Sequence, residues 1–269
     1  MNTVKYIKII TFLFLFFLGT VFSKEIITFS INPLLGFYYE IVGHENKNKW
    51  KYNVLIDSSF DHHHFDIKPS KFKMIKDSKA LFLIGTLELD REVLKITNIK
   101  DKIILSNYLE IYNSDPHIWI SVKNCKKIIQ IMYNYLYSNQ KINRNELYQN
   151  YSKLYRRYDD LDKRLHSSFK QKRIIIFSYH NEFGYISRDY GVNIIPLFKN
   201  EEDISPRYLQ DLIRRIRSYK QNVHIILPVY YDKKVINYIK KELNNINFTI
   251  FNSNSINIYE EFVKLESLR

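Results

Sequence analysis

Three histidines lie where a predicted strand gives way to a loop or to the start of a helix. His63 is in the string HHFDIKPS, His117 in DPHIWIS and His180 in YHNEFGY. Neutral imidazole is a nitrogen donor that suits zinc, and three imidazoles from separate loops fill most of a tetrahedral shell. The three strings therefore predict a metal site. The single cysteine, Cys125, excludes a disulfide or a thiolate zinc site, so the metal must be held by nitrogen and oxygen.

The residues around two of these histidines also bear on the predicted chemistry. In DPHIWIS the proline fixes the backbone before His117, Trp119 is expected to pack beneath the loop, and Asp115 is expected to orient the imidazole. His180 directly follows the run RIIIFSY and begins the next helix. Glu182 lies two residues further on, and we assign it to the helix surface.

The chain around these strings alternates between short β-branched runs and stretches with helical periodicity. The first half carries the runs IITFSI, YNVLI, ALFLIG and KIILSN, and the second half carries RIIIFSY, VNIIPLF, VHIILPVYY and FTIFNS. Segments such as PLLGFYYEIVG and SPRYLQDLIRRIRSYK separate them, the latter with a serine cap and a proline at the first helical position. This alternation predicts an α/β protein with two lobes, each a small parallel sheet flanked by helices.

A stretch from about residue 143 to 171 lacks glycine and proline and places apolar and aromatic residues in steps of three and four. One long α-helix is the natural interpretation, although two helices or a coiled-coil segment would share the pattern. We expect a first lobe at 24–140, a linking helix at 141–172 and a second lobe at 173–269. Because such a helix is stiff, it would limit the lobes to small rocking motions.

The first 23 residues have the features of a secretory signal. Lys5 and Lys8 precede an apolar run, and small residues lead to a cleavage site after Ser23. The run is shorter than the roughly 20 residues of a spanning helix, and no cysteine near the site could carry a lipid. We therefore expect a periplasmic protein.

The net charge of +13 invites a nucleic-acid hypothesis. Export, the spread of basic residues over nearly every segment and the absence of a recognisable nucleic-acid module all weigh against it. We expect no nucleic-acid partner, and we expect a monomer.

Three strings, in one order, resemble the substrate-binding proteins of bacterial zinc and manganese ABC importers. They are HHFDIKPSKFKMIKDSKALFLIG at 63–85, DPHIWIS at 115–121 and HNEFGYISRDYGV at 180–192. The resemblance covers essentially the whole mature chain. It implies two α/β lobes joined by one long helix, a metal in the cleft between them, delivery to an inner-membrane ABC permease, and no catalytic residues. It also favours Zn²⁺ over Mn²⁺, because manganese-binding members typically have glutamate where this chain has His180.

The resemblance also implies which residues bind the metal. His63 fits the family pattern of a histidine six residues before a Pro-Ser that opens a helix, and His117 and His180 complete the trio. Many relatives place an aspartate after the last strand, whereas this chain has Asn252 there, and a neutral amide is a poor zinc ligand. The fourth position is therefore left open between a water molecule, His62 and Asn252.

Two other functions share parts of this pattern. A zinc site with bound water would suit a three-histidine hydrolase, with Asp61, Asp66 or Glu182 as the base. The sequence has no HExxH string, no Gly-x-Ser-x-Gly elbow and no glycine-rich phosphate loop, so we expect binding without catalysis. A periplasmic zinc buffer or an adhesion protein without a permease is the other alternative.

Overall fold

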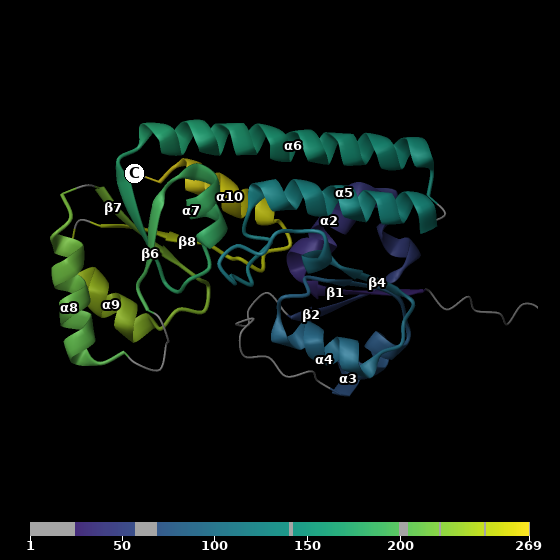
Figure 1. The fold of residues 1–269 in the computed structure, drawn as a ribbon, viewed down its shortest axis with the longest axis horizontal. Helices are drawn as coiled ribbons and strands as arrows, with labels where there is room; N and C mark the ends of the chain where they lie inside the picture. The colour runs from purple at the N-terminus through teal and green to yellow at the C-terminus, as the bar shows by residue number, and fades with distance from the viewer. Residues whose placement is uncertain are drawn as a thin grey trace, which may run out of the picture.

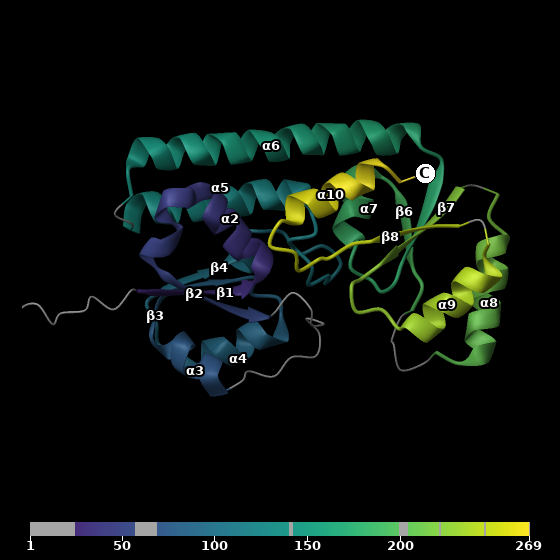
Figure 2. The same ribbon diagram turned by 180° about the vertical axis from the view of Figure 1, so that it is seen from behind.

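The computed structural model describes residues 25–56, 69–139, 142–198, 204–220, 222–244 and 246–268. Two α/β lobes lie side by side beneath one long helix, as the opposite views in Figures 1 and 2 show. The predicted fold class is therefore confirmed. The predicted signal segment lies outside the described residues.

The first lobe is built on a four-stranded parallel sheet. Its strands are β1 (Ile26–Ile31), β2 (Lys51–Ile56), β3 (Ser78–Leu83) and β4 (Asp101–Ile104), in the order β2-β1-β3-β4. Helices α2 (Asn32–Val42), α3 (Pro69–Lys76) and α4 (Glu88–Ile96) connect them, with 3-10 turns η1 (His44–Lys49) and η2 (Leu105–Asn107). The two central strands, β1 and β3, are almost entirely buried because helices and loops cover both faces of the sheet.

The second lobe repeats this arrangement. Strands β5 (Ile174–Ser178), β6 (Asn193–Pro196), β7 (Asn222–Leu227) and β8 (Asn247–Ile250) form a parallel sheet in the order β6-β5-β7-β8. Its helices are α7 (Gly184–Tyr190), α8 (Pro206–Arg217), α9 (Lys233–Glu242) and α10 (Ile258–Glu266). The predicted cap of α8 is present, since the Ser205 side chain accepts a hydrogen bond from the Tyr208 backbone N–H.

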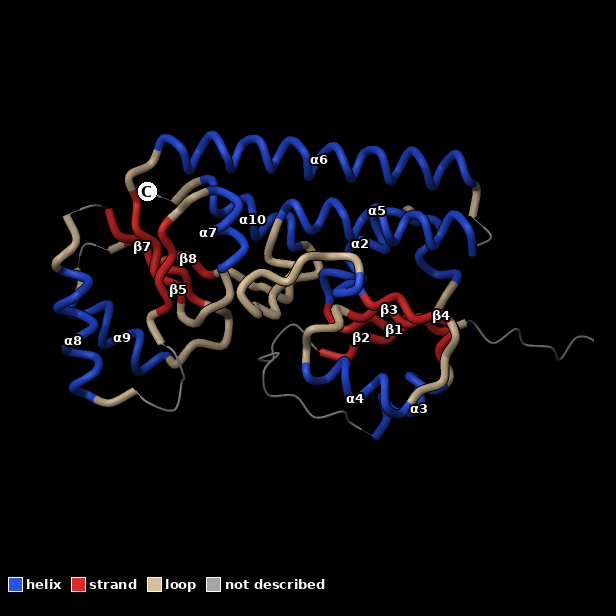
Figure 3. Tube along the Cα trace, viewed as in Figure 1, coloured by secondary structure: helices blue, strands red, loops and turns tan. Residues whose placement is uncertain are grey.

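The linking helix is one continuous element. Helix α5 (Val122–Asn139) leads into α6 (Arg144–Gln171), whose 28 residues run unbroken past both sheets (Figure 3). The Asn143 side chain caps α6 by accepting hydrogen bonds from two backbone N–H groups of the first turn. The buried stripe consists of Leu147, Leu154, Tyr158, Leu161, Leu165 and Phe169. All six belong to the series that the sequence periodicity selects, whereas Tyr151 and Tyr155 of that series are only partly buried. None of the described helices has the length and apolar content needed to cross a membrane.

The C-terminal segment returns to the first lobe. Helix α10 packs along α6, and Phe251 and Phe262 belong to the same hydrophobic cluster as Phe29 of β1 and Leu136 of α5. A second, smaller cluster lies between the β5–β8 sheet and the helices α8 and α9. Most of the core is therefore shared between the two lobes.

Polar contacts also join the lobes at the edge where the strands of the first sheet end. The Asn254 side-chain oxygen accepts from the Asn32 backbone N–H at 2.9 Å, and its amide nitrogen donates to the Ile56 carbonyl at 3.1 Å. Ligands of parallel sheets bind outside the carboxyl ends of the strands, so this edge is where the site residues gather.

Candidate metal centre

The loop before α5 holds His117 by its own aspartate. Oδ1 of Asp115 accepts hydrogen bonds from His117 Nδ1 at 2.6 Å and from the His117 backbone N–H at 2.9 Å. Both side chains are buried. A carboxylate at Nδ1 fixes the imidazole so that Nε2 carries the lone pair, as it does for many metal-binding histidines.

Trp119 supports this loop from below and ties it to the other lobe. Its ring centroid lies 5.4 Å from that of His117, and its indole N–H donates to the Ser253 carbonyl at 2.8 Å. Ser253 is in the segment that follows β8. The indole therefore positions His117 and also joins the two lobes at the site.

Helix α7 locks the same loop from the second lobe. Tyr185 donates its hydroxyl hydrogen to the Asp115 carbonyl at 2.9 Å and accepts from the Tyr112 backbone N–H at 3.1 Å. A Cβ at Gly184 would lie only 2.6 Å from Asp115 Oδ2, so the helix approaches the carboxylate at a distance that only glycine permits. The orientation of Asp115 depends on both lobes.

His180 reaches the same point from the second sheet. It lies two residues beyond the end of β5, and its ring centroid is 5.8 Å from that of His117. The rings of Tyr179 and Tyr230 flank it, with centroids at 6.4 and 6.1 Å. The structure thus brings together two of the three predicted histidines, one from each lobe.

Glu182 does not lie where the sequence predicts it. We assigned it to the helix surface, but it is 1% exposed and its Oε2 lies 3.5 Å from His180 Nε2. Donor atoms of His117, His180 and Glu182 all lie within 4.8 Å of one another. The assignment was wrong because Glu182 precedes α7, in the turn that faces the other lobe.

Of the other predicted ligands, only Asn252 is among the described residues. His62 and His63 lie outside the described residues, as do Asp61 and Asp66. Asn252 is described, and its side-chain oxygen accepts from the Asn254 backbone N–H at 3.1 Å while its own backbone N–H donates to Glu261 at 2.8 Å. These bonds give Asn252 a part in shaping the turn after β8.

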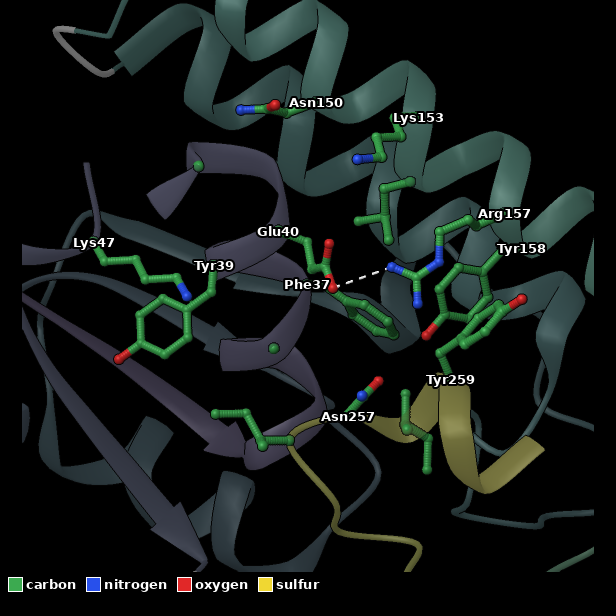
Figure 4. Close-up of a pocket in the computed structure, with 15 residues that line it drawn as sticks. Phe37, Tyr39, Glu40, Lys47, Asn150, Lys153, Arg157, Tyr158, Asn257 and Tyr259 are labelled. Atoms are coloured by element: carbon green, nitrogen blue, oxygen red, sulfur yellow. Dashed lines mark hydrogen bonds and ion pairs between the residues drawn. The ribbon is translucent and has the colours of Figure 1, made fainter. Parts of the chain in front are cut away.

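A surface groove of about 440 Å³ lies elsewhere, between α2, α6 and α10 (Figure 4). Arg157 donates to Glu40 at 3.3 Å there, and its guanidinium lies 4.2 Å from the Tyr259 ring centroid. Lys47 and Lys153 line the same groove. None of its lining residues belongs to the histidine cluster, so the groove is separate from the candidate centre.

Two imidazoles and a carboxylate that converge between two α/β lobes could hold a metal ion, as is expected of a two-lobed, metal-binding solute-binding protein. The model of the family described as zinc-uptake complex component A, periplasmic (ZnuA), matches residues 27–259. The chain belongs to this family. Its members are solute-binding components of metal transport without enzymatic activity, so the hydrolase alternative is set aside.

Individual relatives share the fold or part of the sequence. A crystal structure of ZnuA superimposes with a TM-score of 0.76 at 21% identity, covering 90% of this chain and 96% of that one. The Zn(II)-bound ZnuA-like domain of Streptococcus pneumoniae AdcA gives a TM-score of 0.73 at 16% identity, covering 91% and 98%. A curated protein of Chlamydia trachomatis serovar D, named as a metal-binding protein, is 25% identical over 189 residues, which span 65% of this chain and 66% of that protein.

Proposed function

We propose that this protein captures Zn²⁺ in the periplasm and delivers it to an ABC-type membrane permease. The observation that carries the proposal is the meeting of His117 and His180, which come from different lobes. Both lie beside the contacts that join the lobes, and Asp115 orients one of them. An ion held at this point would bind both halves of the molecule, and so favour their closed arrangement.

His63 supplies the third imidazole in this proposal. Its segment follows Ile56, the last residue of β2, whose carbonyl accepts hydrogen bonds from Asn32 and Asn254. Strand β2 therefore ends at the edge where the lobes meet. The sequence pattern around His63 supports its role, and a water molecule, His62 or, less favourably, Asn252 could then complete the shell.

The donor types favour zinc over manganese. Imidazole nitrogen suits Zn²⁺, whereas Mn²⁺ prefers carboxylate, carbonyl and water oxygen. With His63, His117 and His180 as donors, nitrogen dominates the proposed shell. The affinity order of divalent metals at such sites also places Zn²⁺ above Mn²⁺.

Capture and release would involve little movement of one lobe against the other. The long helix α6, the shared core and the Trp119–Ser253 hydrogen bond all resist a hinge. We expect the metal-free and loaded proteins to differ in loop order more than in lobe rotation. Small-angle scattering with and without Zn²⁺ tests this expectation, and a large compaction on loading would contradict it.

The experiment that tests the proposal is a competition titration of the purified mature protein against a chromophoric zinc chelator, followed by elemental analysis. One equivalent of tightly held zinc is the expected result, and a parallel titration with Mn²⁺ should give weaker binding. A protein that takes up no metal would overturn the proposal. Tighter binding of Mn²⁺ would overturn the choice of metal.

Delivery needs a separate test, because a zinc buffer would bind metal equally well. Cells that depend on this protein should lose uptake of radioactive zinc at low external concentration when His117 is replaced by alanine. Unchanged uptake would instead favour storage of the metal without a permease.

A further inference from the structure

The turn between β5 and α7 carries two inward-facing polar side chains. The Glu182 backbone N–H donates to the His180 carbonyl at 3.0 Å, which closes a tight turn around the exposed Asn181. His180 and Glu182, on either side of it, both face the region between the lobes. The turn therefore places the donor atoms of two side chains, those of His180 and Glu182, close to one point.

The separation of these donors suits a shared metal ion. Ligand atoms about 2.0–2.1 Å from a tetrahedral zinc lie roughly 3.4 Å from each other. His180 Nε2 and Glu182 Oε2 are 3.5 Å apart, and His117 brings a donor nitrogen within 4.8 Å of both. Small side-chain rotations would bring all three within bonding distance of one ion.

The charge of the metal is a second, independent reason to expect a carboxylate among its ligands. Three neutral imidazoles leave both positive charges of Zn²⁺ uncompensated in a buried site, which is costly, whereas one carboxylate among the ligands halves that charge. Glu182 is 1% exposed at this site. The turn after β8 offers no carboxylate in its place, since Asn252 is neutral and its side-chain oxygen bonds to the Asn254 backbone.

We propose that Glu182 is the anionic ligand of the captured metal, so that the second lobe supplies a nitrogen and an oxygen donor from the single turn at 180–182. This inference rests on the proposed function and uses three donors from the described residues, those of His117, His180 and Glu182. Two nitrogens and one oxygen still favour Zn²⁺. The oxygen also makes the site more accommodating to a harder ion such as Mn²⁺ than three histidines and a water would be.

The test replaces Glu182 by glutamine, which keeps the size of the side chain and its capacity to accept a hydrogen bond but removes the charge. We expect the affinity for Zn²⁺, measured by chelator competition, to fall by about 100-fold or more, above the range for residues that only orient a ligand. Glu182→Asp should recover part of the loss. Glu266→Gln, which removes a half-buried carboxylate at the end of α10 that pairs with Arg164 and lies outside the cluster, is the control and should bind as the wild type does.

A spectroscopic measurement separates a ligand from a positioning residue. Co²⁺ bound in place of zinc should give the visible absorption of a tetrahedral site in the wild type, and the bands should shift in Glu182→Gln. Unchanged affinity and an unchanged Co²⁺ spectrum in that variant would overturn the inference and leave zinc capture intact. A wild-type protein that binds neither ion would overturn the proposed function itself. The metal-free variants should unfold at the same temperature as the wild type. This result would show that the lower affinity for Zn²⁺ does not come from a loss of folding.

Discussion

His117 donates two hydrogen bonds to one carboxylate oxygen of Asp115, one from the Nδ1 of its imidazole and one from its own backbone N–H. The short loop thus fixes both the position of the histidine and the rotation of its ring. The second oxygen, Oδ2, is buried without a hydrogen-bond partner among the described residues and lies against Gly184. A buried negative charge of this kind favours a cation nearby.

Replacing His117 by alanine should remove a donor from the centre. We expect the affinity for Zn²⁺ to fall by more than the roughly 10- to 100-fold that loss of an orienting residue costs. His166→Ala, on the exposed face of α6, is the control and should bind normally. Chelator competition measures both variants, and equal losses would argue against the assignment of His117.

His224→Ala should lower the stability of the protein without lowering its affinity for Zn²⁺. This histidine is buried on β7, and its Nε2 is 2.8 Å from Thr249 Oγ1 on the neighbouring strand. Loss of a buried hydrogen bond and of packing should lower the free energy of unfolding by about 1–3 kcal/mol. Denaturant unfolding should record the loss, while the affinity for Zn²⁺ in the folded protein should stay the same.

Gly184→Ala tests the close approach of α7 to the aspartate. The added methyl group would displace the Asp115 side chain, so the imidazole of His117 would lose its fixed orientation. We expect the affinity for Zn²⁺ to fall by about 10- to 100-fold, although alanine is the better helix former. Gly191→Ala is the matched control, because its Cβ meets nothing within 4 Å and its positive φ predicts only a loss of stability. Equal affinity in the two variants would contradict the role of Gly184.

Trp119→Phe should weaken the link between the lobes. The substitution keeps an aromatic ring beneath His117 but leaves the Ser253 carbonyl without its indole donor. An unpaired buried carbonyl costs about 1–3 kcal/mol, and denaturant unfolding should show a loss of that size. Hydrogen exchange should also increase after β8, and a variant as stable as the wild type would show that the bond contributes little.

Asp90 predicts a pH dependence of stability that is unrelated to the metal. Burial raises the pKa of its carboxyl to about 6, against the lowering effect of hydrogen bonds from Ser30 and the Gly85 backbone. The pKa of an aspartate in the unfolded state is about 3.9. Between that pH and the pKa of the folded state, Asp90 therefore binds a proton in the folded protein but not in the unfolded chain. Stability from this group should fall as the pH rises from about 4 to about 6 and stay level above that, by at most roughly 2–3 kcal/mol.

Denaturant unfolding of the metal-free protein at several pH values measures this effect. In Asp90→Asn the fall between pH about 4 and about 6 should be smaller than in the wild type. Groups other than Asp90 titrate in both proteins and cancel in the comparison. Asp77→Asn, at an exposed aspartate after α3, should reproduce the wild-type curve. Parallel curves for wild type and Asp90→Asn would refute the assignment.

Much of the fold could be predicted because its signals are local. Each β-branched run became a strand, and the stripe on residues 144–171 became one helix, since periodicity alone decides which face of a segment is buried. The return of α10 to the first core could not be predicted. It depends on contacts such as that between the rings of Tyr259 and Tyr158, which are 101 positions apart, and no local pattern records them.

The candidate centre was predictable to a similar extent. The strings around His117 and His180 identified two side chains that the fold brings together. Glu182 was missed because a polar residue at the start of a helix usually faces solvent, and its burial comes from the opposite lobe. Its signal was a carboxylate two positions from a predicted ligand, in a chain with no carboxylate between its last strand and Glu260.

The path of the C-terminal segment also has a consequence for how the molecule assembles. Phe251, Ile258, Phe262 and Leu265 belong to the same hydrophobic cluster as residues of the first sheet. Part of the apolar surface of the amino-terminal half therefore stays exposed until the last helix has been synthesised. Heating or denaturant should accordingly melt both halves together in one cooperative step, and a chain shortened before α10 should fail to reach the native state.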